Sequence, residues 1–223
     1  MTREMTMVHT GFLREFFLMP ELVKGVPDGN RDRAEIVAEH IAMMSFGLHH
    51  HHQAEDVGIW PRLLERAPEE IRPLVHGMEK HHERIATGLE DLTKGIAAWR
   101  ADPTPANRDA VTRTLADLLP VLREHLAEEL EYVLPLIEKH IAGDEWDATF
   151  AAGLSQMPPE SLPLVMGLMM YEGEPAAVQD SLNNVPEEIR PAVAAAAPKA
   201  YGDYAERLYG TRTPPRAATL IHR

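Results

Sequence analysis

The sequence predicts an all-α protein: an up-down-up-down four-helix bundle followed by additional C-terminal helices. Apolar residues recur at helical spacing along four long segments within residues 5–142. Only short connectors separate these segments, and short connectors place consecutive helices antiparallel to each other. No segment has convincing strand alternation, so no β-sheet is expected.

The first two helices are expected at about residues 6–24 and from residue 31 to about residue 67. Phe12 and neighbouring apolar residues form one stripe of the first helix. The turn between the helices spans residues 25–30, which include two glycines and a proline. Pro61 should kink the second helix, because its ring removes one backbone donor and crowds the preceding turn.

The third helix should begin at Pro68, since proline suits the first helical position, and run to about residue 100. Residues 102–105 contain two prolines and form the next turn. The fourth helix is then expected from about residue 106 to residue 142, before Gly143. Together these segments predict a four-helix domain ending at Gly143.

Residues 144–223 form a second part, a C-terminal extension of shorter helices. An apolar strip within residues 162–169 predicts that these helices pack against the bundle or against a second copy of the chain. A homo-oligomer formed through the extension is therefore possible. The segment 211–216 contains two prolines and is expected to be an extended tail.

Composition excludes several classes of function. The formal net charge of -13 over 223 residues argues against binding to nucleic acid or to an anionic membrane surface. Without cysteine, the chain has no disulfide or thiolate ligand, so nitrogen and oxygen must hold any metal. The N-terminus does not resemble a signal peptide, and no apolar stretch is long enough to span a membrane, so a cytoplasmic location is expected. No nucleotide-binding motif or pocket for an organic substrate is indicated.

A His-x3-Glu-x5-Pro motif occurs twice, first from His51 and again, 74 residues later, from His125. Residues four apart share a helix face, so each copy presents an imidazole beside a carboxylate, Glu55 in the first and Glu129 in the second. Two such pairs on facing helices can form a metal cage. The repeat therefore predicts a metal site between two equivalent helices.

Both glutamates should point into the core. Glu55 lies within about 20° of the centre of the apolar stripe on its helix, and Glu129 within about 30°, whereas Glu128 faces away. An unpaired carboxylate in an apolar core costs several kcal/mol, and no Lys or Arg lies on the same stripes. A cation taken from solution would balance both charges.

Histidines accompany the carboxylates on each inward face. His9 lies in the stripe of the first helix, where a lone histidine is more often a core residue than a ligand. His51 and His52 flank the stripe of the second helix, and His81 and His82 flank that of the third. Their combination with two inward carboxylates favours metal binding over coincidence.

These residues resemble the hemerythrin-like family, the HHE cation-binding domain, over roughly residues 5–142. The resemblance rests on a histidine in the first helix, on both His-x3-Glu-x5-Pro motifs, and on Glu79-Lys80-His81-His82 in the third helix. It implies a bundle that holds two iron ions, bridged by an oxo or hydroxo group and by two carboxylates. It further implies that two carboxylates bridge the irons and that four histidines are terminal ligands. The bridging residues are Glu55 and Glu129, and the terminal ligands are His9, His51, His82 and His125.

The third helix departs from the pattern of the oxygen-carrying hemerythrins, which place two histidines there four residues apart. Met78 and Ala86 stand four residues to either side of His82, so one nitrogen ligand is missing or replaced. The residues that could substitute, besides a water molecule, are His52, His81 and Glu79. A less complete ligand shell favours reaction with peroxide, nitric oxide or dioxygen over reversible oxygen carriage.

The expected function is that of a non-haem di-iron protein that binds or reduces a small oxygen or nitrogen species, namely dioxygen, peroxide or nitric oxide. Such a protein would be a di-iron oxidoreductase cycling between diferrous and diferric states. Two alternatives stay open: a non-catalytic protein that binds, senses or stores iron or dioxygen, and a helical interaction module with a single structural metal. Histidine and carboxylate ligands also accept manganese or zinc.

Overall fold

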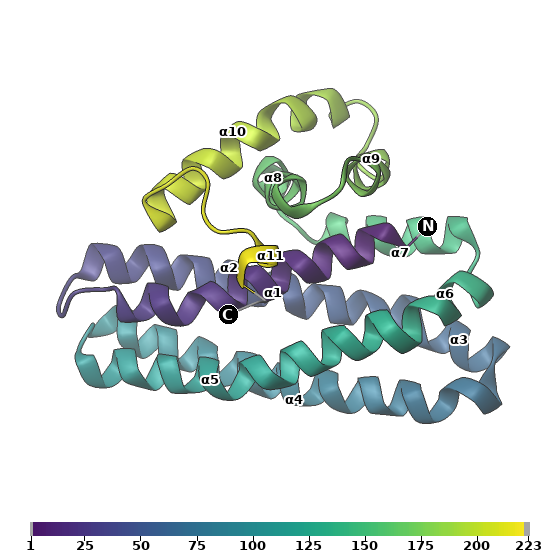
Figure 1. The fold of residues 1–223 in the computed structure, drawn as a ribbon, viewed down its shortest axis with the longest axis horizontal. Helices are drawn as coiled ribbons and strands as arrows, with labels where there is room; N and C mark the ends of the chain where they lie inside the picture. Colours follow the sequence, from purple (N-terminus) through teal and green to yellow (C-terminus); the bar gives the residue numbers. More distant parts are fainter. Residues whose placement is uncertain (1, 221–223) are drawn as a thin grey trace.

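Residues 2–220 are described by a computed structural model, and within this range the protein is built of helices. Four long helices lie side by side (Figure 1). Helix α1 contacts α2 and α5, and α4 contacts the same two helices, so the four form a closed set of neighbours. Their bounds are α1 Arg3–Lys24, α2 Arg31–Gly58, α4 Pro68–Ala101 and α5 Pro105–Glu128.

The second expected helix is divided in two. Helix α2 ends at Gly58, and a separate helix α3 spans Trp60–Arg66. Sequence reasoning expected a kink at Pro61 in one continuous helix, whereas the break falls at Ile59. Proline at position 61 has no amide hydrogen to donate to the turn before it, so the helix restarts with proline in its first turn.

The fourth expected helix is interrupted by a π-helical turn that the sequence did not reveal. Helix α5 passes directly into the π-helix η1, Glu129–Val133, and then into α6, Leu134–His140. The amide of Leu134 donates to the carbonyl of Glu129, five residues earlier. A π-turn inserts one extra residue into a helix and is frequent at functional sites. Here it begins at one of the two predicted bridging carboxylates.

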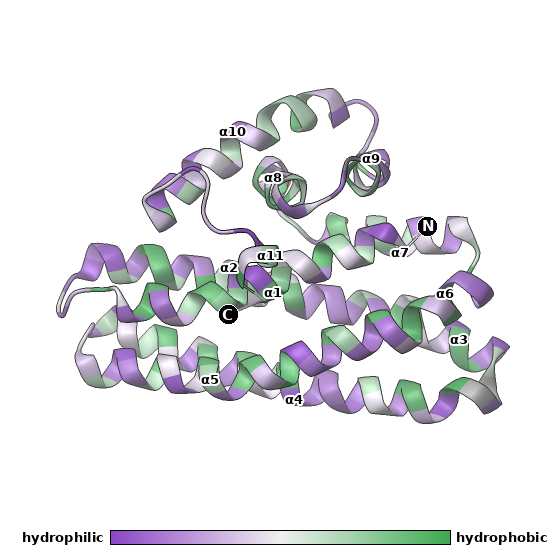
Figure 2. Ribbon diagram, in the orientation of Figure 1, coloured by the Kyte–Doolittle hydropathy of each residue, from purple (hydrophilic) through white to green (hydrophobic). Residues whose placement is uncertain are grey.

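Two apolar clusters fill the space between the long helices. One contains residues such as Phe16, Ile41 and Leu115, and the other contains residues such as Leu63 and Ile137. Hydrophobic and hydrophilic residues are interspersed along each long helix, as expected for amphipathic helices (Figure 2). Buried histidines lie near the change from one cluster to the other, with His9 between Met5 and Phe12 in α1 and His82 between Met78 and Ile85 in α4.

The extension packs on the bundle. Helix α7 (Gly143–Ser155) contacts α2, and helices α8 (Leu162–Glu172), α9 (Pro175–Asn183) and α11 (Ala217–Leu220) contact α1. A 3-10 turn, η2, spans Pro159–Ser161, and α10 (Arg190–Tyr209) lies against α8 (Figure 1). Packing on the bundle is one of the two arrangements that the apolar strip allowed.

The end of the chain is only partly as expected. Residues 211–216 contain no helix or strand, and the short helix α11 that follows was not anticipated. The tail is held in place, since the carbonyl oxygens of Pro214 and Pro215 accept hydrogen bonds from Tyr171 and Arg14. None of the helices in the described range is long and apolar enough to cross a membrane.

Candidate metal centre

Five helical segments bring seven of the predicted ligands into the middle of the bundle. Helix α1 supplies one histidine, α2 supplies two histidines and a glutamate, α4 and α5 supply one histidine each, and η1 supplies the second glutamate. Six of the seven residues are buried and one is partly buried. Their donor atoms form two groups, each within 4.8 Å: His52, Glu55, His82 and His125 in group one, and His9, His51, Glu55 and Glu129 in group two.

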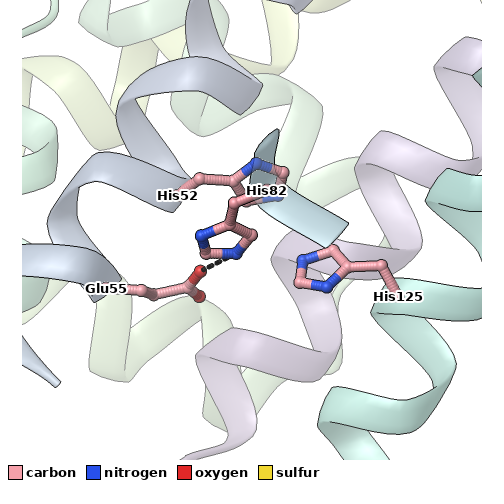
Figure 3. A group of neighbouring side chains, drawn as sticks. All are labelled: His52, Glu55, His82 and His125. Atoms are coloured by element: carbon pink, nitrogen blue, oxygen red, sulfur yellow. Dashed lines mark ion pairs between the residues drawn. The ribbon is translucent and has the colours of Figure 1, made fainter. Parts of the chain in front are cut away.

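Group one converges from three helices (Figure 3). The rings of His52 and His82 stack with centroids 4.1 Å apart, and the ring of His125 stands nearly perpendicular to that of His52 at 4.8 Å. Nε2 of His82 lies 3.5 Å from Oε2 of Glu55. Three imidazoles and one carboxylate therefore surround one point, which is a ligand set suited to iron, manganese or zinc.

Group two lies on the other side of Glu55. Nε2 of His9 and Nε2 of His51 are 3.0 Å apart. Two nitrogen donors bound at a right angle to one metal, with bonds of about 2.1 Å, would lie about 3.0 Å apart. Oε2 of Glu129 is 3.5 Å from Nε2 of His9, and Oε1 of Glu55 is 3.1 Å from Nε2 of His51. The spacing of these atoms fits the ligands of a single cation.

The two glutamates connect the groups. Glu55 turns Oε1 toward His51 of group two and Oε2 toward His82 of group one. Glu129 turns Oε2 toward both His9 and His125, at 3.5 and 3.7 Å. Each carboxylate thus lies near one histidine of each group, but only Glu55 belongs to both groups and turns a different oxygen toward each.

Most of the donor atoms have no hydrogen-bond partner within the described protein, the exception being Nε2 of His9 and Nε2 of His51, which pair with each other. Both oxygens of Glu55, both oxygens of Glu129 and Nε2 of His82 are buried and unsatisfied. Such groups cost free energy unless something binds them. The ion-pair partners found for the two carboxylates in the described part of the chain are histidines. The site therefore fits a cation that supplies both the missing charge and the missing bonds.

Burial controls the protonation of the metal-free cluster. It raises the pKa of Glu129 to about 8 and, together with the nearby charge of Glu129, raises the pKa of Glu55 well above its ordinary value. Burial lowers the pKa of His51 to about 3 and that of His125 to about 2. These two imidazoles are therefore neutral at pH 7, which is the form that binds metals.

A chain of hydrogen bonds orients His82. Nδ1 of His82 lies 2.7 Å from Oδ1 of Asp56, and the indole N–H of Trp60 donates to the same oxygen at 2.9 Å. A carboxylate beyond the imidazole favours a proton on Nδ1, which leaves the lone pair of Nε2 facing the cluster. Asp56 is not among the candidate ligands that the sequence indicates, and the structure adds it as the residue that positions His82.

The remaining candidates lie outside both groups. Nδ1 of His81 is 4.0 Å from a carboxylate oxygen of Glu128, which is 40% exposed. Glu79 pairs with His76 near the surface, at 2.9 Å. Met78 is buried in the apolar cluster. Of the three proposed substitutes for the missing nitrogen ligand, only His52 lies with His82 and His125.

Helices that bring buried histidines together with two carboxylates whose oxygens lack hydrogen-bond partners are typical of a cation-binding helical protein. The model of the hemerythrin HHE cation-binding domain matches residues 1–137, and the chain therefore belongs to that family. No protein of curated function and no solved structure shows significant similarity to the chain. The match ends before the extension.

Proposed function

We propose that this chain is a non-haem di-iron protein that binds or reduces a small oxygen or nitrogen species at the centre described above. The observation that carries the proposal is the carboxylate of Glu55, whose two oxygens face two different groups of histidines. One cation would leave one of those groups without a partner. Family membership supports cation binding.

The seven residues would hold two irons in different roles. Glu55 and Glu129 would bridge, with His9 and His51 on one side and His52, His82 and His125 on the other. Two irons held in this way would supply electrons to, or accept them from, a small bound molecule. The protein's own part is to keep the imidazoles of His51 and His125 neutral through burial and to hold His82 through Asp56.

The proposal extends to the domain organisation. Residues 1–143 would form the up-down-up-down bundle with the centre, and residues 144–223 an extension that supplies no ligand. The neighbour pattern of α1, α2, α4 and α5 supports the bundle, and the end of the family match near residue 137 supports the boundary. Truncation after Gly143 should leave the metal content unchanged.

Metal analysis tests the proposal directly. Purified protein should contain close to two irons per chain and absorb in the near ultraviolet, where bridged iron absorbs and zinc does not. Glu55→Gln and Glu129→Gln should each lower the iron content well below that of the unmodified protein. Glu128→Gln is the matched control, because Glu128 is the neighbour of Glu129 and is exposed.

Two results would overturn the assignment. One is a single tightly held zinc, and the other is an equal loss of metal in the Glu128 and Glu129 variants. Reactivity is tested separately in stopped flow, where the reduced protein should be oxidised irreversibly by dioxygen or peroxide. A spectral change that reverses fully under vacuum would indicate reversible oxygen carriage instead.

A further inference from the structure

A cavity of about 160 Å³ lies between the bundle and the extension. Its walls come from α1 and α2 on one side and from α7 and α8 on the other, the region where the extension lies against the bundle in Figure 1. The approach of α7 is close, because a Cβ at Gly58 would lie 2.6 Å from Oγ1 of Thr149. The extension therefore completes a cavity that the bundle alone would leave open.

The lining is mainly apolar and rich in methionine. Six of the eleven methionines of the chain line it, and the extension adds Phe150, Leu154 and Leu168. Methionine is flexible and polarisable, so it adapts to apolar ligands of different shapes. The six are Met5, Met7, Met43, Met44, Met157 and Met169.

The polar part of the wall includes two residues of the candidate metal centre, besides His50, Thr149 and the indole N–H of Trp146. His51 and Glu55 line the cavity, and both oxygens of Glu55 lack a hydrogen-bond partner. Glu15 also lines it, but its two oxygens accept hydrogen bonds from Arg14 and Tyr209. An occupant would therefore contact an apolar wall on most sides and the centre at one point.

Size separates two classes of occupant. A single water molecule needs a cavity volume of only about 10–15 Å³. An apolar cavity of about 150 Å³, by contrast, stays dry and holds a benzene molecule. We propose that this cavity binds an uncharged, apolar organic molecule about as large as a monocyclic aromatic ring, next to His51 and Glu55. This goes beyond the proposed function by adding a second ligand beside the centre, and binding to the cavity walls does not depend on the metal.

Methyl NMR of the full-length protein with labelled methionine and toluene as the probe tests the proposal. Toluene should shift the methyl signals of the six cavity methionines saturably and leave those of Met19 and Met78, which are buried elsewhere in the bundle, unchanged. Benzoate, which has a similar ring but carries a charge, should produce no shift. In iron-loaded protein, toluene should also change the optical spectrum of the centre, because His51 is in the wall.

Filling the cavity provides a second test. A Cβ at Gly11, which lines the cavity, would meet no heavy atom within 4 Å. Gly11→Leu should weaken toluene binding at least tenfold. Gly77→Leu is the matched control, since Gly77 also lies within a long helix with open space around its Cβ but does not line the cavity.

Several results would overturn the proposal. One is the absence of saturable shifts at the six methionines, and another is equal toluene affinity in unmodified and Gly11→Leu protein. A third is a cavity that binds xenon but not toluene, which would indicate a passage for small gas molecules. A finding of zinc in place of iron would overturn the di-iron assignment and leave toluene binding intact, so the two failures are distinguishable.

Discussion

Two buried polar clusters share helices α1 and α2, and they balance their negative charge differently. In the candidate metal centre, Glu55 and Glu129 have histidine neighbours but no hydrogen-bond donor. In the second cluster, Glu15 accepts hydrogen bonds from Arg14 and Tyr209, and Glu172 lies 3.0 Å from Nε of Arg14. The first cluster lacks an internal cation, whereas the second contains one.

The second cluster joins the extension to the bundle. Arg14 belongs to α1, its guanidinium lies 5.0 Å from the ring centroid of Tyr171, and it donates to the carbonyl of Pro215. His40 of α2 lies 2.7 Å from the hydroxyl of Tyr204 in α10. Burial of a carboxylate therefore does not by itself indicate a metal site. The indication comes from a carboxylate whose oxygens have no donor.

Removal of the metal should lower the stability of the fold more than any of the substitutions below, because only the first cluster depends on an external cation. A chelator is expected to lower the free energy of unfolding by about 4 kcal/mol or more, if free metal had exceeded its dissociation constant a thousandfold. Thermal unfolding before and after chelation, followed by restoration with ferrous iron, measures this. Complete metal loss with an unchanged melting temperature would show that the first cluster is stable without a cation.

Arg14→Met should have the next largest effect, since it leaves Glu15 and Glu172 buried without their cation. Loss of one partner from a buried ion pair typically costs about 3–5 kcal/mol. Urea unfolding measures the loss, and Arg100→Met is the control because the Arg100–Glu35 pair is partly exposed and should contribute less than about 1 kcal/mol. The iron content should stay the same; its loss in a folded Arg14→Met protein would mean that the two clusters are coupled.

The sequence predicted the first cluster better than the second. The candidate ligands recur at helical spacing, and the local positions of Glu55 and Glu129 within their apolar stripes place both on inward faces. In the structure these residues are buried and close together, while their ligation stays a prediction. Arg14 gave no comparable signal, because its partners Glu172 and Pro215 are distant in sequence and belong to the extension.

Other features also depend on contacts that no local pattern encodes. His52, and not His81, lies with His82 in group one. This depends on how α2 is rotated against α4, which the pattern of a single helix does not reveal. The π-turn at Glu129 adds only one residue to the helix. The apolar residues of the fourth segment keep their helical spacing on either side of it, so the sequence pattern does not indicate the turn. The cavity requires the docked extension, so its existence could not be inferred from the bundle sequence.

Acid should weaken the second cluster through His40. Burial lowers the pKa of His40 to about 3, whereas the unfolded residue titrates near 6.5. As the pH falls below 6.5, the unfolded state takes up a proton that the folded state refuses until about pH 3, so stability falls with pH across this window. The loss is on the order of a few kcal/mol. His40→Gln should flatten the difference in unfolding free energy between pH 7 and pH 4.5, and equal slopes for the two proteins would exclude His40 as the cause.

Tyr209→Phe should give the smallest effect, and it tests the second cluster without removing a charge. The Tyr209 hydroxyl donates to Oε2 of Glu15, and Nε2 of His40 lies 3.4 Å from the same oxygen. Because the cation of Arg14 remains, loss of this one donor should cost only about 1–2 kcal/mol in urea unfolding. Tyr132→Phe, at a tyrosine that is 50% exposed, should change stability by less than about 0.5 kcal/mol. A Tyr209→Phe loss as large as that of Arg14→Met would mean that the hydrogen bond, not the cation, holds Glu15 in the core.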